Sequence, residues 1–402
     1  MAPGTQVAAL VSYSDTGPRP GIRDAAVIAG IHDSPFARSL SASEPELAAQ
    51  VALGACRDAG IDPSEIDGMV SYTIESTLDT TMSHMIGTGD LSFFANVNYG
   101  GGGAPGAVGL MATAIATGRC DVGLVWRSRK RGSGGRPWRS RSAHPLTALS
   151  AEFSRPAGIL RPVDEVAMLA RRYLHTYGVS REQLANVALT LRQHANRVPG
   201  AMMHDRPLTL DEYMSARWIS EPLCLFDNCL ESDGACAVIM VAADRAADLR
   251  RPPVYVHAAS QGMPSGMGSP INFYNDDPLR TPGSVSARAL FARSDIGPAD
   301  IDVVQIYDAF SPLVLWALEA YGFCDRGEGG AFVSDGRIST GGKLPVNTAG
   351  GSLSGAYIHG FNLITEGVRQ LREEADNQVP GARTCLITGA EIAPSSAVII
   401  RR

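Results

Sequence analysis

The sequence contains very little lysine and no long apolar run. Lys130 and Lys343 are the only lysines among 402 residues, so Schiff-base catalysis has two candidates at most. The net charge of −6 does not favour binding to nucleic acid. No apolar run is long enough for a membrane span, and no basic segment with an apolar core opens the chain. We therefore expect a cytoplasmic protein without a membrane span.

Signatures of disulfides and metal sites are also missing. The seven cysteines include no C-x-x-C pair, and without an export signal we expect all of them to be reduced thiols. We predict no metal site and no bound cofactor.

What the chain does have is an alternation of strand and helix patterns. Apolar runs typical of buried strands occupy residues 25–31, 68–72, 91–97, 121–126, 254–258, 301–306 and 384–388. Helical patterns lie between them, at 44–60, 106–117, 162–198, 284–292, 313–321 and around 364–371. This rhythm predicts an α/β protein with a mostly parallel sheet. The rhythm restarts after a proline-rich joint at 251–253, which suggests an internally duplicated fold.

A glycine-rich turn, Asn98 to Ala107, stands between a strand pattern and a helical pattern. The start of a helix presents free N–H groups and the positive end of the helix dipole, which suits an anion. The turn contains no Cys, Ser, Thr or Lys, and it is not a phosphate-binding loop because the nearest lysine is Lys130. The alternative is a turn that is merely tight or flexible.

A basic run follows the fourth strand pattern. Its seven basic residues are Arg127, Arg129, Lys130, Arg131, Arg136, Arg139 and Arg141. The run is either a solvated loop or a clamp for phosphates, with Trp138 available to stack on a base. His175 and His194 lie on helical patterns without a partner at ligand spacing, so we expect them to be surface or structural residues.

An ordered set of motifs resembles the thiolase superfamily, and within it the sterol-carrier-protein-X type thiolases and lipid-transfer proteins. These motifs are Glu46-Leu-Ala-Ala49, Asp58-Ala-Gly60, the turn and helix at 98–118, the segment 220–235, Tyr307-Asp-Ala-Phe310, and Leu344-Pro-Val-Asn-Thr-Ala-Gly-Gly351. Each motif alone is weak, but their order along residues 24–402 is specific. The resemblance implies a five-layer αβαβα fold, a homodimer and an acyl-CoA substrate, so that coenzyme A enters only as part of the substrate.

The resemblance also divides the chain. Residues 1–23 form an N-terminal extension, and residues 24–250 form a first half with an inserted cap region at about 125–220. Residues 251–402 form the second half. An acyl-CoA substrate favours the phosphate-clamp interpretation for Arg127, Arg129, Lys130, Arg131 and Arg136.

The chain departs from the thiolase pattern at each catalytic position. The nucleophilic Cys of a thiolase falls at about Gly101, and the catalytic His falls at Tyr357. The second catalytic Cys falls near Ile387, two residues from Cys385. Tyr307 replaces the Asn or His of the Asn-Glu-x-Phe and His-Asp-x-Phe motifs. No covalent acyl-enzyme is expected at the turn.

This set of replacements is similar to that of the steroid side-chain-cleaving aldolases of the superfamily. Such enzymes cleave a β-hydroxyacyl-CoA with a tertiary alcohol into a ketone and a short acyl-CoA such as propionyl-CoA, and several work with a small OB-fold partner that carries a zinc ribbon. Tyr307 and Tyr357 are then the expected acid–base groups, positioned or tuned by Asp308 or His359. Gly101, Gly102 and Gly103 would supply an oxyanion hole.

Other interpretations stay open from the sequence. Tyr307 and Tyr357 could be packing residues, and Asp308 could be a structural partner of a backbone amide. His359 would face away from Tyr357 if their segment were helical. The alternatives for the whole protein are a diverged thiolase using Cys385, a non-catalytic lipid carrier or scaffold, and a biosynthetic aldolase acting on a non-steroid acyl-CoA.

Overall fold

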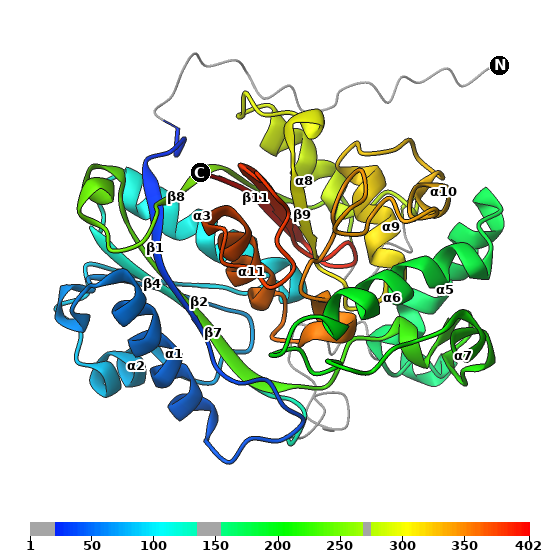
Figure 1. Cartoon of the computed structure of the whole chain (residues 1–402), viewed down its shortest axis with the longest axis horizontal. Coiled ribbons are helices and arrows are strands. Elements are labelled where there is room, and N and C mark those ends of the chain that lie inside the picture. The colour runs from blue at the N-terminus through cyan, green and yellow to red at the C-terminus, as the bar shows by residue number, and fades with distance from the viewer. Residues whose placement is uncertain (1–20, 135–153, 268–274) are drawn as a thin grey trace.

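The computed structural model describes residues 21–134, 154–267 and 275–402. A nine-stranded mixed sheet runs through the molecule in the order β3-β2-β4-β7-β1-β8-β11-β10-β9 (Figure 1). The first half of the chain supplies β1 (Ala26–Asp33), β2 (Gly68–Tyr72), β3 (Phe93–Val97), β4 (Val122–Lys130) and β7 (Asp233–Ala242). The second half supplies β8 (Val254–Gly262), β9 (Val303–Ile306), β10 (Thr384–Thr388) and β11 (Ser395–Arg401).

The two halves repeat one pairing scheme. In the first half β2 pairs in parallel with β3 and β4, and β4, β7 and β1 follow as antiparallel neighbours. In the second half β9 pairs in parallel with β10, and β10, β11 and β8 follow as antiparallel neighbours. A parallel bridge between Val304 and Val346 takes the place of β3. Since β1 and β8 join the halves, the predicted α/β fold with two similar halves is confirmed. The predicted mostly parallel sheet is wrong, because three of the eight strand pairings in the described nine-stranded sheet are parallel and five are antiparallel.

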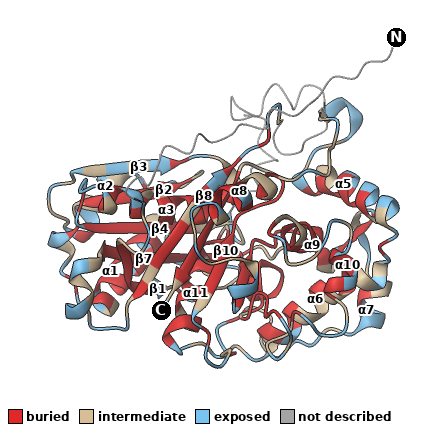
Figure 2. Cartoon of the chain, turned by 90° about the horizontal axis from the view of Figure 1, so that it is seen from above, coloured by how far each residue is buried: buried red, intermediate tan, exposed pale blue. Residues whose placement is uncertain are grey.

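Helices cover the strands in layers. On one face α1 (Glu44–Ala59) packs on β1, β4 and β7, with α2 (Asp79–Ile86) beside it. On the other face lie α3 (Gly103–Ala116) and α11 (Phe361–Arg372), which contact each other and strands of both halves. Beyond the second-half strands, α8 (Pro282–Phe291) packs on β8 and β11. The order helix, strand, helix, strand, helix is the expected five-layer arrangement, and Figure 2 shows that its centre is buried.

Side chains that alternate along each strand contribute to two apolar clusters, one on each face of the sheet. Val70 and Val125 belong to the apolar cluster that includes α3, while their neighbours Met69 and Leu124 belong to the cluster that includes α1. Successive side chains of a strand point to opposite faces, and here both faces are covered by helices. The strands therefore read as nearly continuous apolar runs.

A helical region lies at one end of the molecule, drawn mostly in green in Figure 1. It contains α5 (Pro162–Tyr177), α6 (Arg181–Asn196), α7 (Leu210–Ser215) and the two-stranded sheet of β5 (Trp218–Ser220) and β6 (Leu223–Cys224). It packs on α9 (Ser311–Ala320) and α10 (Gly329–Phe332) of the second half through α6. The helices expected at 162–198 are present, while the limits of the cap and of the two halves stay predictions.

Strand β4 is longer than expected. Residues 127–130 were predicted to begin a loop, but β4 continues through them and pairs with β7 as far as Lys130 and Asp233. The first part of the basic run is therefore strand. Within the described ranges, no helix combines the length and the apolar character that a membrane span requires.

Candidate active site

The glycine turn has no room for a side chain at Gly101, Gly102 or Gly103. Residues Gly100–Gly102 form a 3-10 turn that leads directly into α3 at Gly103. A Cβ atom on Gly101 would lie 2.3 Å from the hydroxyl oxygen of Tyr307. The position at which a thiolase carries its cysteine is therefore filled by the Tyr307 side chain. The first N–H groups of α3 have no partner within the helix, so the turn can stabilise a negative charge.

Two buried tyrosines meet beside this turn. The hydroxyl groups of Tyr307 and Tyr357 are hydrogen-bonded at 2.8 Å, and the residues are 3% and 4% exposed. Burial raises the pKa of both hydroxyls, that of Tyr307 well above its usual value. The guanidinium of Arg131 lies 4.9 Å from the centre of the Tyr357 ring and opposes this rise in the pKa of Tyr357. Both hydroxyls are therefore protonated at neutral pH, and Tyr357 is the easier of the two to ionise.

His359 belongs to the same group. Its ring centre lies 6.3 Å from that of Tyr307 and 5.7 Å from that of Tyr357. The segment is not helical, so His359 does not face away from Tyr357. Burial lowers the pKa of His359 well below its usual value, and the nearby Arg127, then Arg129 and Arg131, lower it further. The imidazole is therefore neutral.

Asp308 is a structural partner of the backbone, which was one of its two predicted roles. Its carboxylate accepts hydrogen bonds from the N–H groups of Ser352, at 2.7 and 2.9 Å, and Leu353, at 3.1 Å. Burial raises the pKa of Asp308 to about 6, and these bonds oppose the rise. The contact ties the end of β9 to the segment before Tyr357, so Asp308 sets the distance between the two tyrosines.

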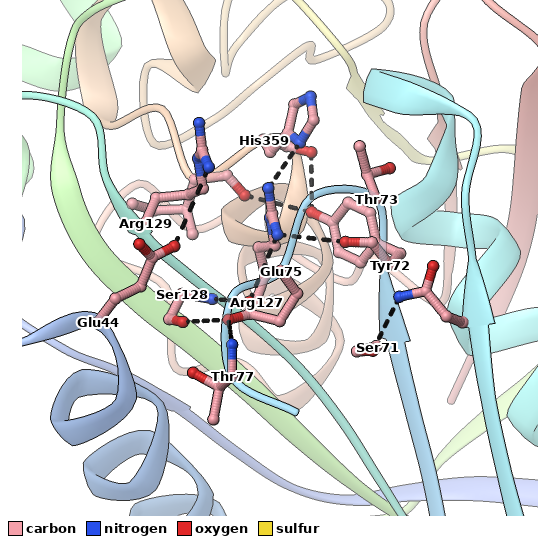
Figure 3. Close-up of polar contacts among 12 residues, drawn as sticks. Glu44, Ser71, Tyr72, Thr73, Glu75, Thr77, Arg127, Ser128, Arg129 and His359 are labelled. Carbon is pink, nitrogen blue, oxygen red and sulfur yellow. Dashed lines mark hydrogen bonds and ion pairs between the residues drawn. The ribbon is translucent and has the colours of Figure 1, made fainter. Parts of the chain in front are cut away.

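The basic residues predicted to bind CoA phosphates lie in different environments. Arg127 is fully buried, and its guanidinium forms an ion pair with Glu75 at 3.4 Å (Figure 3). This burial and pairing argue against a contact between Arg127 and a phosphate of CoA, so that predicted role stays a prediction without structural support. Arg129 lies 4.0 Å from Glu44.

Lys130 and Arg131 complete the described part of the run. The ammonium of Lys130 donates to the carbonyl oxygens of Leu40 and Ala42, and it lies 3.7 Å from the carboxylate of Asp233. Arg131 contacts Tyr357 and lines the cavity described next. Arg136 lies outside the described residues, so its predicted role stays a prediction, as do those of Arg129 and Arg131.

A cavity of about 580 Å³ opens next to Arg131, which contacts Tyr357, but Tyr307, Tyr357 and His359 are not among the described residues that line it. The part of its wall nearest to these tyrosines is formed by Arg131, Cys229, Phe310 and Leu353. Five further arginines line it: Arg38, Arg161, Arg192, Arg206 and Arg217. Arg38, Arg206 and Arg217 are exposed, and the described part of the chain provides no carboxylate that pairs with them. The mouth of the cavity is therefore positively charged.

The cysteines do not form a nucleophilic site. Cys385 is fully buried on β10, away from the residues that line the cavity, and burial raises its pKa well above the usual value. Cys229 does line the cavity, but burial raises its pKa to about 11. A thiol with such a pKa is protonated at neutral pH and is a weak nucleophile.

Several residues of this region were missed in the sequence. Glu75 and Tyr72 bond to Arg127 and His359, but their partners lie 52 to 287 positions away, so no local pattern reveals the contacts. A weak signal existed for Tyr72, since it ends β2 beside the strand that leads to the glycine turn, and ends of parallel strands meet at one edge. The cavity arginines come from separate loops and helices and carry no shared motif.

Comparisons with known proteins agree with this fold. The family described as Thiolase C-terminal domain-like matches residues 271–400. The chain is 39% identical over 381 residues to the 17-hydroxy-3-oxo-4-pregnene-20-carboxyl-CoA lyase of Mycobacterium tuberculosis, covering 93% of this chain and 98% of the relative. It is also 39% identical to the steroid side-chain-cleaving aldolase of Thermomonospora curvata, with 94% and 97% covered.

A solved structure named Ltp2-ChsH2(DUF35) aldolase superposes on 94% of this chain and 98% of that chain, with a TM-score of 0.91 and 38% identity. The resemblance inferred from the motifs is thus confirmed by sequence and by fold. The chain belongs to the family of steroid side-chain-cleaving aldolases, carbon–carbon lyases with a thiolase fold.

Proposed function

We propose that this protein is a retro-aldolase that cleaves a β-hydroxyacyl-CoA with a tertiary alcohol into a ketone and a short acyl-CoA such as propionyl-CoA. The observation that carries the proposal is the hydrogen-bonded pair of Tyr307 and Tyr357, packed on a turn where a thiolase nucleophile has no room. The names of the two relatives support a steroid side chain as the acyl group.

In the proposed reaction the ionised form of Tyr357, a minor fraction at neutral pH, accepts the proton of the β-hydroxyl. Its ionisation is favoured by Arg131 above its ring and by a hydrogen bond donated from Tyr307. The electron pair of the O–H bond forms the ketone, the bond between the α- and β-carbons breaks, and its electrons form the enolate of the short acyl-CoA. A tyrosine hydroxyl then returns a proton to the α-carbon. The amides of Gly101 and Gly102 stabilise the charge on the thioester oxygen, whereas the N–H of Gly103 already donates to the carbonyl oxygen of Gly100.

The arginine-lined cavity is the proposed site of the CoA thioester. Its apolar wall includes Val163, Leu225 and Phe226, while its charged wall contains the exposed Arg38, Arg206 and Arg217 together with Glu231. Guanidinium groups bind phosphates strongly because they offer several donors in one plane. Arg131 would then contact the substrate at the tyrosine end.

We also propose a homodimer. Strand β3 is an edge strand paired only with β2, and Phe94 on it is 65% exposed. Leu78 is 66% exposed and Ile74 47% exposed, in the loop that follows β2. An unpaired apolar edge favours pairing with a second copy of itself about a two-fold axis. Analytical ultracentrifugation tests this interface. A dimeric wild type and a monomeric Phe94→Asp variant would support it.

A small OB-fold protein with a zinc ribbon is a further proposed partner. The support is the 0.91 TM-score to an aldolase whose name contains a second component. Turnover measured with and without such a partner tests this proposal. The seven cysteines are all free thiols, which supports a cytoplasmic location.

Replacing the tyrosines tests the catalytic proposal. Tyr307→Phe and Tyr357→Phe each remove one hydroxyl and leave the ring, so we expect folded proteins with kcat reduced about 10²- to 10⁴-fold. Tyr255→Phe on β8 is the matched control and should keep wild-type turnover. Near wild-type turnover in both site variants would refute the assignment. Binding of an acyl-CoA by the wild type without any cleavage would favour the lipid-carrier alternative.

A further inference from the structure

We infer that Arg127 and Glu75 are positioning residues that hold His359 with its proton on Nε2, and that this N–H donates a hydrogen bond to the thioester oxygen of the substrate. The inference rests on the proposed function and assigns a further part of that site. A polar network joins β4, the loop after β2 and the segment beyond Tyr357 (Figure 3).

The direction of one hydrogen bond fixes the form of the imidazole. Nη2 of Arg127 lies 3.2 Å from Nδ1 of His359. A guanidinium has five donors and no acceptor, so Nδ1 must be the acceptor in this contact. A neutral imidazole with an accepting Nδ1 carries its proton on Nε2. His359 therefore offers an N–H donor on the side of the ring away from Arg127.

Arg127 itself is held without freedom to turn. Its Nη1 donates to the carbonyl oxygen of Tyr72 at 3.2 Å and to Glu75 at 3.4 Å. The Glu75 carboxylate also accepts from the N–H and the hydroxyl of Ser128, at 2.7 and 2.6 Å, and from the N–H of Thr77. The side chains of Arg127 and Glu75 are 0% and 1% exposed. Within the described residues Nε of Arg127 has no partner, but the other bonds of this buried pair are enough to fix its geometry.

The backbone and the ring of His359 are fixed as well. His359 adopts φ of +56°, which is uncommon for a residue with a side chain. The Tyr72 hydroxyl donates to the His359 carbonyl oxygen at 2.9 Å, and the two rings stack with their centres 6.0 Å apart. Strained backbone of this kind persists where the surroundings determine it, and it is frequent at functional sites.

The free nitrogen of this histidine is available for a ligand. Figure 3 shows the second ring nitrogen pointing away from Arg127. In the described part of the chain no residue forms a hydrogen bond with Nε2, although the ring lies within 6.3 Å of both site tyrosines, centre to centre. A neutral N–H placed beside three arginines suits an oxygen that becomes negative during the reaction, as the thioester oxygen does in enolate formation.

Nitrogen NMR of the protein labelled with ¹⁵N-histidine tests the inference directly. The signal of His359 is assigned by its loss in His359→Asn. We expect an unprotonated Nδ1 and a protonated Nε2 in the wild type at neutral pH, without any substrate. A proton on Nδ1, or a doubly protonated ring, would overturn the inference whatever the reaction of the enzyme proves to be.

Two substitutions test the positioning role. Arg127→Met removes the donor, so we expect both tautomers of His359 to appear and kcat to fall about 100-fold with little change in KM. Glu75→Gln keeps the shape of the side chain but weakens its hold on Arg127, and it provides a second variant if Arg127→Met does not fold. We expect a smaller loss of the same kind.

Arg372→Met is the matched control, since Arg372 is an equally buried arginine paired with Asp58 and distant from the site. It should leave the His359 spectrum unchanged. Wild-type turnover by a folded Arg127→Met would refute the positioning role, even if the tautomer in the wild type is the expected one. An inactive wild type with the expected tautomer would instead refute the proposed function alone.

Discussion

Adding one methyl group to the glycine turn should disable the tyrosine pair. Gly101 lies in a 3-10 turn and not in the left-handed region, so Gly101→Ala brings no backbone strain. The new Cβ would lie 2.3 Å from the Tyr307 hydroxyl oxygen, whereas ordinary contacts begin at 3.4 Å. The ring of Tyr307 must therefore move by about 1 Å, which breaks its 2.8 Å bond to Tyr357.

The magnitude follows from this displacement. A shift of about 1 Å in a catalytic group costs about 100-fold in rate, which corresponds to about 2.7 kcal/mol in the barrier. Overpacking beside a buried ring should lower the free energy of unfolding by about 1–3 kcal/mol. We therefore expect Gly101→Ala to be folded, modestly destabilised and nearly inactive.

The assay measures kcat at saturating β-hydroxyacyl-CoA together with thermal unfolding of the same preparation. Gly341→Ala is the control, since no atom lies within 4 Å of the Cβ that it adds. That variant should match the wild type in both measurements. A Gly101→Ala variant with wild-type kcat and wild-type stability would show that Tyr307 does not occupy this space during catalysis.

Two further predictions follow from charges in the structure. Arg131→Gln removes the cation over the Tyr357 ring, so the pKa of Tyr357 should rise and the alkaline increase of kcat/KM should move to higher pH; a pH–rate profile with an unmoved alkaline limb would contradict this. Burial raises the pKa of Glu391 from a usual 4.5 to about 7. As the pH rises through this interval, the free energy of unfolding should therefore fall by up to about 3 kcal/mol. Glu391→Gln should flatten this part of the stability profile in urea unfolding at pH 5 and pH 8, and an unchanged slope would refute the attribution.

Most of the fold was accessible from the sequence because its signals are local. Strand β2 was expected at 68–72 and lies there, and α1 lies in the helical pattern at 44–60, where a capping box of Ser43 and Glu46 begins it. His194, expected to be a surface or structural residue, is structural, since it is buried and bonded to the backbone of Asn347 and Thr340. Apolar periodicity and capping chemistry act within a few residues, so a single sequence contains them.

The remaining features depend on contacts between distant segments. Arg127 looked like part of a solvated basic loop, but Glu75 compensates its charge and allows β4 to continue into the interior. The tyrosine pair was accessible only through its match to family positions, because 50 residues separate Tyr307 from Tyr357. The cavity arginines were missed for the same reason, since they approach one another only in the folded chain.

A product assay in deuterated water, with no free CoA, tests the central claim most directly. The purified protein, with and without an OB-fold partner, is given a β-hydroxyacyl-CoA that bears a tertiary alcohol, and the products are identified by mass spectrometry. Retro-aldol cleavage predicts a ketone and a short acyl-CoA that carries one deuterium on its α-carbon, because the enolate is protonated by a group that exchanges with solvent. The absence of cleavage under these conditions, together with shortening of a β-ketoacyl-CoA once CoA is added, would contradict the account and establish thiolysis.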